Sequence, residues 1–189
     1  ELLSLSLGSS ETTLLKLTSA YCSFVNGGKL IDAKFIDRIQ DSEGNTIFNS
    51  ENRECEGCDQ ISYISNNIPK IKNNFKQIMS KETAYQMTSI LEGTVKRGTA
   101  KGLRDLNLDL GGKTGTTNKN TDTWFIGFSS NYVIGVYVGY DEPSSLGKYE
   151  TGARTAMPIF KSFVKNSVKK NNARPFKVPE GITMLVVNS

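Results

Sequence analysis

The residues best suited to chemistry in this sequence form one short run, Gly-Gly-Lys-Thr-Gly-Thr-Thr-Asn at residues 111–118. Glycines and small hydroxyl residues beside a strand leave the backbone open to a ligand. Lys113 supplies a fixed positive charge there, and Thr114, Thr116 and Thr117 supply hydroxyl groups. Together these groups predict a site for a substrate that carries a carboxylate.

The composition excludes several other kinds of site. The sequence contains no histidine, which rules out Ser-His-Asp and Cys-His catalysis, histidine-bound zinc or haem, and pH sensing by imidazole. Its 23 Lys+Arg and 19 Asp+Glu leave a net charge of +4, and so small an excess does not predict nucleic-acid binding. We expect no metal and no cofactor.

The cysteines do not predict a metal or redox site. Cys55 and Cys58 form a lone C-x-x-C in a polar segment, and Cys22 is the third cysteine. A structural zinc needs four ligands, and no second pair is present. A thioredoxin-like pair needs a helix N-terminus behind a strand, which this segment lacks. The two residues are therefore predicted to be loop thiols, free or bridged.

A phosphate-binding loop is the main competing interpretation of the lysine. The Walker pattern G-x-x-x-x-G-K-[ST] ends like residues 112–114, but its first glycine would fall on Asn107. No helix is predicted after the run that would point its N-terminus at a phosphate. Nucleotide binding is therefore disfavoured. The remaining non-functional interpretation of the run is a tight glycine-rich turn with an exposed lysine.

Two helices are predicted ahead of the run. The first spans residues 13–25, with Thr13 as its cap, and ends at Asn-Gly-Gly. The second spans residues 81–96 and is capped by Ser80. Its predicted buried stripe consists of Ala84, Met87, Leu91 and Val95.

The elements around and after the run are mostly strands. Residues 108–110 alternate like a short strand, and residues 124–128 and 133–138 form two apolar strands of a hairpin. A last helix is predicted from about Pro158 to Lys170. Its predicted buried face consists of Ile159, Phe160, Phe163, Val164 and Ser167. Helices flanking a partly antiparallel sheet indicate an α+β fold.

The rest of the chain has weaker patterns. Residues 29–54 are predicted to be short strands around a polar turn at 41–45. Residues 55–79 are polar and irregular, which predicts a surface insertion, and residues 172–189 form a C-terminal tail. No stretch approaches the roughly 20 apolar residues of a membrane span.

Longer motifs around the lysine resemble a known family. Residues 111–118 are followed by Asp-Thr-Trp-Phe-Ile-Gly-Phe at 122–128, and together they resemble the K-T-G-T-T-N…D-x-W-F-x-G-F stretch of the bifunctional (class A) penicillin-binding proteins. Further resemblances lie at residues 7–11 with 20–21 and 26–28, and at residues 95–100, 135–141, 150–160 and 179–182. They extend to nearly the whole chain except residues 40–79.

The resemblance implies that residues 1–171 are the C-terminal portion of a transpeptidase domain, with the β-lactamase/transpeptidase-like fold of the serine penicillin-recognising enzymes. In this family a serine attacks the D-Ala-D-Ala end of a peptidoglycan stem peptide, and an amine of a neighbouring strand then takes the acyl group; β-lactams trap the serine. The implied partners are the stem peptide, its lipid-linked precursor, β-lactams and the remainder of the same domain. The implied location is the periplasmic side of the bacterial cytoplasmic membrane.

The resemblance also implies residue roles. Lys113 is the expected catalytic residue, supplying positive potential for the substrate carboxylate and for proton transfer. Thr114, Thr116 and Thr117 are expected substrate-binding residues, with the Thr116 hydroxyl on the carboxylate and its N–H in the oxyanion hole. Gly115 is expected to keep the strand bare, so that the donor peptide lies along it as an extra strand.

Four nearby residues are assigned to packing rather than to ligand contact. They are Arg97, Thr99, Trp124 and Phe125.

The family's nucleophile is not found in its expected place. The motifs S-x-x-K and S-x-N precede the segment at which this chain starts, so we expect no nucleophile in the chain and no acylation of the chain alone. Chance matches to these motifs occur at residues 145–148, 162–165, 167–170, 50–52, 65–67 and 129–131. The N-terminal glycosyltransferase domain and membrane anchor of the family are likewise not part of the sequence.

Two alternatives stay open. One is a catalytically incomplete fragment that acts as a binding or regulatory module. The other is a serine β-lactamase or β-lactam sensor on the same fold, against which the long tail argues.

Overall fold

The computed structural model describes residues 10–50, 53–58, 69–72, 74–168 and 174–185. None of the helices in these ranges is long and apolar enough to cross a bilayer. The chain divides into two compact units, which are described separately.

The larger unit comprises residues 1–31 and 77–189, and the smaller unit comprises residues 32–76. The smaller unit contains most of the predicted insertion at 55–79 together with the segment before it. The assignment of 55–79 as a surface insertion and of 172–189 as a separate tail stays a prediction.

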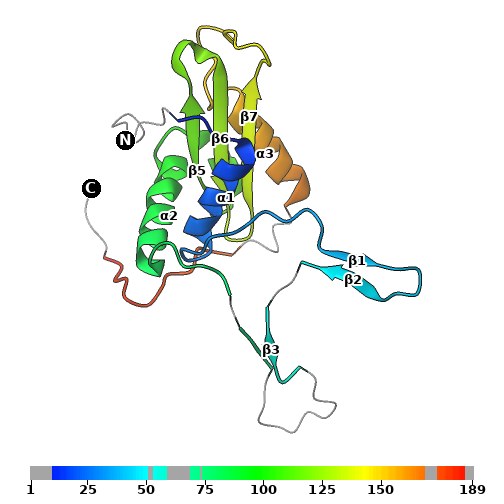
Figure 1. Ribbon diagram of the computed structural model, residues 1–189. Coiled ribbons are helices and arrows are strands. Elements are labelled where there is room, and N and C mark those ends of the chain that lie inside the picture. The colour runs from blue at the N-terminus through cyan, green and yellow to red at the C-terminus, as the bar shows by residue number, and fades with distance from the viewer. Residues whose placement is uncertain (1–9, 51–52, 59–68, 73, 169–173, 186–189) are drawn as a thin grey trace. The chain divides into compact units, whose positions relative to one another are not determined.

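The larger unit is built on a three-stranded antiparallel sheet in the order β5-β6-β7 (Figure 1). The strands are β5 (Gly111–Thr116), β6 (Asp122–Phe128) and β7 (Val133–Gly139). Gly111 of β5 lies opposite Phe128 of β6, which in turn lies opposite Val133 of β7. The predicted hairpin is confirmed, with β6 starting two residues earlier than expected.

The first two helices agree with the sequence prediction. Helix α1 (Leu14–Val25) and helix α2 (Lys81–Lys96) are capped by Thr13 and Ser80, whose hydroxyls accept hydrogen bonds from Lys16 N and Thr83 N. These hydroxyls satisfy backbone donors that have no partner inside a helix. The stripe of α2 is confirmed, with Ala84, Leu91 and Val95 buried and Met87 half-buried.

The last helix differs from the prediction. Helix α3 (Ala156–Ser167) begins two residues before Pro158 and stops at Ser167, because Val168 has an extended backbone. Pro158 fits within the first turn, because backbone N–H groups there have no hydrogen-bond partner inside the helix and proline's lack of an N–H breaks no helical bond. The predicted face was partly wrong, since Ile159 and Phe163 are about half exposed. The buried face consists of Ala156, Met157, Phe160 and Val164.

The helices cover both faces of the sheet (Figure 1). A Cβ at Gly135 of β7 would touch Leu14 and Thr18, so α1 packs closely against one face. On the opposite face the ring of Phe160 packs edge-on against Phe125, with ring centroids 5.0 Å apart. The main core lies on this second face and includes Leu103, which belongs to a 3-10 helix, η2 (Lys101–Leu106), that the sequence analysis did not predict.

The strand predicted at residues 108–110 is wrong. These residues are irregular, and the strand begins at Gly111, so the glycine-rich run is itself the strand β5. The alternation of Leu108, Asp109 and Leu110 reflects Leu110 entering the core from a loop.

The smaller unit contains two short antiparallel pairs. Strands β1 (Arg38–Gln40) and β2 (Thr46–Asn49) form a hairpin, and strands β3 (Cys55–Glu56) and β4 (Lys70–Ile71) form the second pair. The predicted turn between β1 and β2 is confirmed. The Asp41 carboxylate closes it by accepting hydrogen bonds from the Asn45 side-chain amide and from Glu43 N and Asn45 N. The side-chain bond from Asn45, followed by the backbone bonds, lowers the pKa of Asp41.

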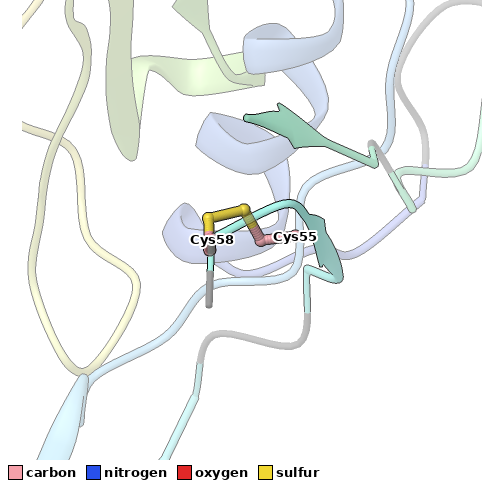
Figure 2. Close-up of a disulfide and its surroundings, with 2 residues drawn as sticks. All are labelled: Cys55 and Cys58. Carbon is pink, nitrogen blue, oxygen red and sulfur yellow. A yellow bond between two sulfur atoms is a disulfide. The ribbon is translucent and has the colours of Figure 1, made fainter. Parts of the chain in front are cut away.

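Cys55 and Cys58 are joined by a disulfide at the end of β3 (Figure 2). Of the two predicted states, free thiols or a disulfide, the structure contains the disulfide. Gly57, inside the closed loop, has a positive φ of 86°, a conformation that glycine adopts without strain.

Candidate functional site

The K-T-G residues lie on β5, which is one of the two edge strands of the three-stranded sheet in the described part of the chain. The N–H of Thr117 donates to Asp122 O of the neighbouring strand at 3.1 Å. Hydrogen-bonded pairs alternate along an antiparallel ladder, so the backbone groups of Lys113 and Gly115 also face β6. The N–H and C=O groups of Thr114 and Thr116 consequently point away from the sheet, toward its open edge.

Helix α2 covers the first part of this edge. The hydroxyl of Thr94 donates to Gly112 O at 2.7 Å and lies 2.8 Å from Leu91 O. Among the described residues no strand pairs with the edge beyond this point. No described strand therefore occupies the outward backbone groups of Thr114 and Thr116.

Lys113 lies in this open half of β5. Its side chain is exposed, and its ammonium donates to Thr114 O at 2.7 Å. Within the described part of the chain it forms no salt bridge, so its charge is not neutralised by a carboxylate. An uncompensated ammonium beside outward backbone donors favours a carboxylate ligand.

The three threonine hydroxyls have different partners. The hydroxyl of Thr114 lies 3.4 Å from that of Thr99. The hydroxyl of Thr117 accepts from Asp122 N at 2.8 Å and closes the turn that holds the 3-10 helix η3 (Asn118–Asn120). The hydroxyl of Thr116 accepts from Gly152 N at 3.1 Å. Thr116 is exposed, and its proton is left for a ligand.

The glycines of β5 make room for aromatic rings of β6. A Cβ at Gly111 would lie 2.5 Å from the ring of Phe128, and a Cβ at Gly112 would lie 2.8 Å from the ring of Phe125. A Cβ at Gly115 would lie 3.1 Å from Trp124 Cβ. Close packing inside the sheet is thus one reason for the glycine content, beside the ligand access suggested by the sequence.

The four residues assigned to packing divide into two pairs. Phe125 is fully buried, and half-buried Trp124 packs edge-on against Tyr137 at a centroid distance of 4.8 Å. Desolvation, reinforced by the charge of nearby Asp122, raises the pKa of Tyr137. Arg97 and Thr99, in contrast, are exposed, so their assignment to core packing was wrong.

Within the described ranges, neither the segments that line a large cavity nor the chance serine motifs include the K-T-G residues. A cavity of about 750 Å³ lies between the end of α1, the start of α2 and the segment 174–180, and none of the residues 113–117 lines it. Ser145 lies in an exposed loop, where its hydroxyl accepts from Gly147 N. Ser162 is exposed on α3, and residues 65–67 and 169–170 lie outside the described ranges.

The geometry also bears on the phosphate alternative. The Gly-Lys-Thr at residues 112–114 lies within a strand, and the chain continues into the three-residue helix η3 and then into β6. A Walker lysine instead lies between a strand and a long helix whose N-terminus binds phosphate. The arrangement is therefore not that of a Walker loop.

Comparison with known proteins identifies relatives along most of the chain. The family model for the penicillin binding protein transpeptidase domain matches residues 1–165. Penicillin-binding protein 1A of Rickettsia conorii is 42% identical over 188 residues, which cover 98% of this chain and 24% of the relative. Penicillin-binding protein 1A of Neisseria flavescens is 36% identical over 181 residues, covering 95% of this chain and 21% of the relative.

Solved structures give the same result for the fold. The crystal structure of penicillin-binding protein 1A from Haemophilus influenzae has a TM-score of 0.75 and 30% identity, covering 94% of this chain and 29% of that one. A D,D-transpeptidase domain from Eggerthella lenta, at 22% identity and a TM-score of 0.56 over 82% of this chain and 32% of that one, shares the fold. The chain spans about a quarter of the length of the curated relatives named above.

The family resemblance inferred from the motifs is thus confirmed, as is the α+β penicillin-recognising fold. The chain belongs to the penicillin-binding protein transpeptidase family.

Proposed function

We propose that this chain supplies the K-T-G strand of a D,D-transpeptidase that cross-links peptidoglycan. The single observation that carries the proposal is the position of Lys113, whose uncompensated ammonium lies at the open edge of β5 next to outward-facing backbone groups. A D-Ala-D-Ala peptide laid along this edge as an added strand would meet backbone donors and a positive charge at its carboxylate end.

The proposed roles of the β5 residues and Thr117 in substrate binding and catalysis differ. Lys113 attracts the carboxylate and stabilises negative charge that develops during acyl transfer. The Thr116 hydroxyl binds the carboxylate, and the outward N–H of Thr116 serves as one oxyanion donor. Thr114 and Thr117 border this contact, with their hydroxyls engaged by Thr99 and by Asp122 N.

The covalent step would occur on a serine contributed from outside the chain. The serine oxygen bonds to the penultimate carbonyl carbon, the amide bond to the terminal D-Ala breaks, and D-Ala leaves with the proton taken from the serine. An amine of a neighbouring stem peptide then displaces the serine. If water takes the place of the amine, the same acyl-enzyme gives D-Ala-D-Ala carboxypeptidase activity.

The proposed surroundings follow from this chemistry. The substrates are stem peptides and their lipid-linked precursors, which places the site on the periplasmic side of the cytoplasmic membrane. β-Lactams would occupy the same edge through their own carboxylate and acylate the same serine.

The test is acylation by a fluorescent penicillin, using protein expressed with the sequence encoded upstream of Glu1. Lys113→Ala should lower the second-order acylation rate constant by roughly 100-fold or more, because an electrostatic contact to the reacting group is lost. Lys101→Ala, an exposed lysine on η2, is the matched control and should leave the rate constant unchanged.

Two results would count against the proposal. An undiminished rate constant in Lys113→Ala would remove this lysine from the mechanism. A stable β-lactam adduct on the 189-residue chain alone, detected by intact mass, would show that one of its own serines is the nucleophile.

A further inference from the structure

The hydrogen bond between Gly152 and Thr116 indicates a role for a residue that the motif itself does not contain. A threonine hydroxyl has one proton to donate and lone pairs that accept. Gly152 N donates to Thr116 Oγ1 at 3.1 Å, so a lone pair of Thr116 is used and its proton is not. No described residue accepts that proton. The hydroxyl is therefore left as a donor for a ligand.

We infer that Gly152 is a positioning residue whose backbone N–H orients the Thr116 hydroxyl to donate to the substrate carboxylate. This inference rests on the proposed function. The group that acts is the backbone amide of residue 152, because glycine has no functional side chain.

Only glycine fits at this position. Gly152 is buried, and a Cβ there would lie 2.4 Å from Trp124 O and 2.6 Å from Gly115 O. Contacts below 3.0 Å with backbone atoms require the backbone to move. The loop approaches β5 and β6 closely enough to reach Thr116 because residue 152 lacks a side chain.

The segment around Gly152 is held from both ends. Gly152 O accepts from Met157 N of α3 at 2.8 Å, and the hydroxyl of Thr155 lies 2.6 Å from that of Thr123 on β6. Gly147 and Lys148 precede Gly152 in the chain, and their backbone carbonyls accept hydrogen bonds from the Asn120 side-chain amide at 2.9 and 3.0 Å. The amide that meets Thr116 is thus fixed by bonds to the sheet, to α3 and to the turn after β5.

A fixed amide is what a preorganised carboxylate site requires. An exposed threonine side chain free to rotate would spend part of its time in rotamers that point the hydroxyl away from the ligand. With one rotamer fixed beforehand, the ordering cost is not incurred when the substrate binds. Charge-assisted hydrogen bonds are also about twice as strong as neutral ones, so a correctly aimed donor contributes most to a ligand that carries a carboxylate.

The test compares a penicillin with its methyl ester, in protein that includes the sequence encoded upstream of Glu1. The readout is the ratio of the two acylation rate constants, acid over ester. Thr116→Val should lower this ratio by about tenfold or more, the value of a hydrogen bond to a charged group, while Thr116→Ser should retain it. Gly152→Ala should lower the ratio similarly although the Thr116 hydroxyl is still present. Gly102→Ala, in which the new Cβ would meet only the flexible end of Met157, is the matched control.

A purely structural role of Gly152 gives a different result, because it would slow both compounds equally and leave the ratio unchanged. An unchanged ratio in Gly152→Ala, with a lowered ratio in Thr116→Val, overturns this inference and leaves the proposed function intact. Absence of acylation in the unaltered protein would instead refute the proposed function.

A second measurement covers the case in which Gly152→Ala does not fold. Hydrogen exchange of the Gly152 amide should be faster in Thr116→Val than in the unaltered protein, and Thr116→Ser should restore the slow rate. Equal exchange rates in all three proteins would show that the hydrogen bond is not formed, and would also overturn the inference.

Discussion

The packing of α3 against the sheet gives a stability prediction with a built-in control. Phe160 is fully buried and packs edge-on against Phe125. A Cβ at Gly127 would lie 2.4 Å from the Phe160 ring, so the ring already occupies the space above that glycine. Phe160→Ala would leave a cavity in the core, and it should lower the free energy of unfolding by about 3–5 kcal/mol.

The control lies one turn further along the same helix. Phe163 is 52% exposed, so Phe163→Ala should change the free energy of unfolding by less than about 1 kcal/mol. Urea unfolding followed by circular dichroism measures the change in the free energy of unfolding for both variants. A double-mutant cycle with Phe125→Leu should give a coupling energy of about 0.5–1.5 kcal/mol for the ring pair. Similar losses in Phe160→Ala and Phe163→Ala would refute the assignment of the buried face.

The other two predictions concern titratable and reactive groups. Burial raises the pKa of the Cys22 thiol, so Ellman's reagent at pH 8 should find one thiol that reacts slowly in the native chain and fast after denaturation; three fast thiols without reductant would contradict the Cys55–Cys58 disulfide. The hydrogen bond from Lys161 lowers the pKa of Asp105. The stabilisation from this pair is therefore present above the unfolded-state pKa of the aspartate and is lost as pH falls through the folded-state pKa. An NMR titration should show the pKa of Asp105 rising in Lys161→Ala, and an unchanged value would show that the 2.8 Å contact is not maintained in solution.

Local signals predicted the first two helices accurately and the glycine strand poorly. Thr13 and Ser80 are caps that satisfy backbone donors within one turn, so sequence neighbours decide where these helices start. The strand β5 has three glycines in six residues, a composition that argues against a strand. It forms because β6 pairs with it and the rings of Phe125 and Phe128 fill the space that the glycines leave.

The face of α3 was mispredicted for a related reason. Its apolar residues Ile159, Phe160 and Phe163 all fit a helical stripe, and their spacing alone cannot choose among overlapping faces. The sheet makes the choice, since Phe160 has Phe125 opposite it and Phe163 has no described core residue to cover it.

The sequence by itself determined which functional groups are present, namely a lysine within K-T-G-T-T and no histidine, and its motifs indicated the family. Residue types and their order carry that information because a reaction depends on which functional groups are present. Only the tertiary structure decided which of those groups are available. It closes a turn with the Thr117 hydroxyl, brings Gly152 N from 36 residues away to Thr116 and leaves Lys113 at an open edge. These outcomes depend on contacts between distant segments, for which a short run of sequence contains no signal.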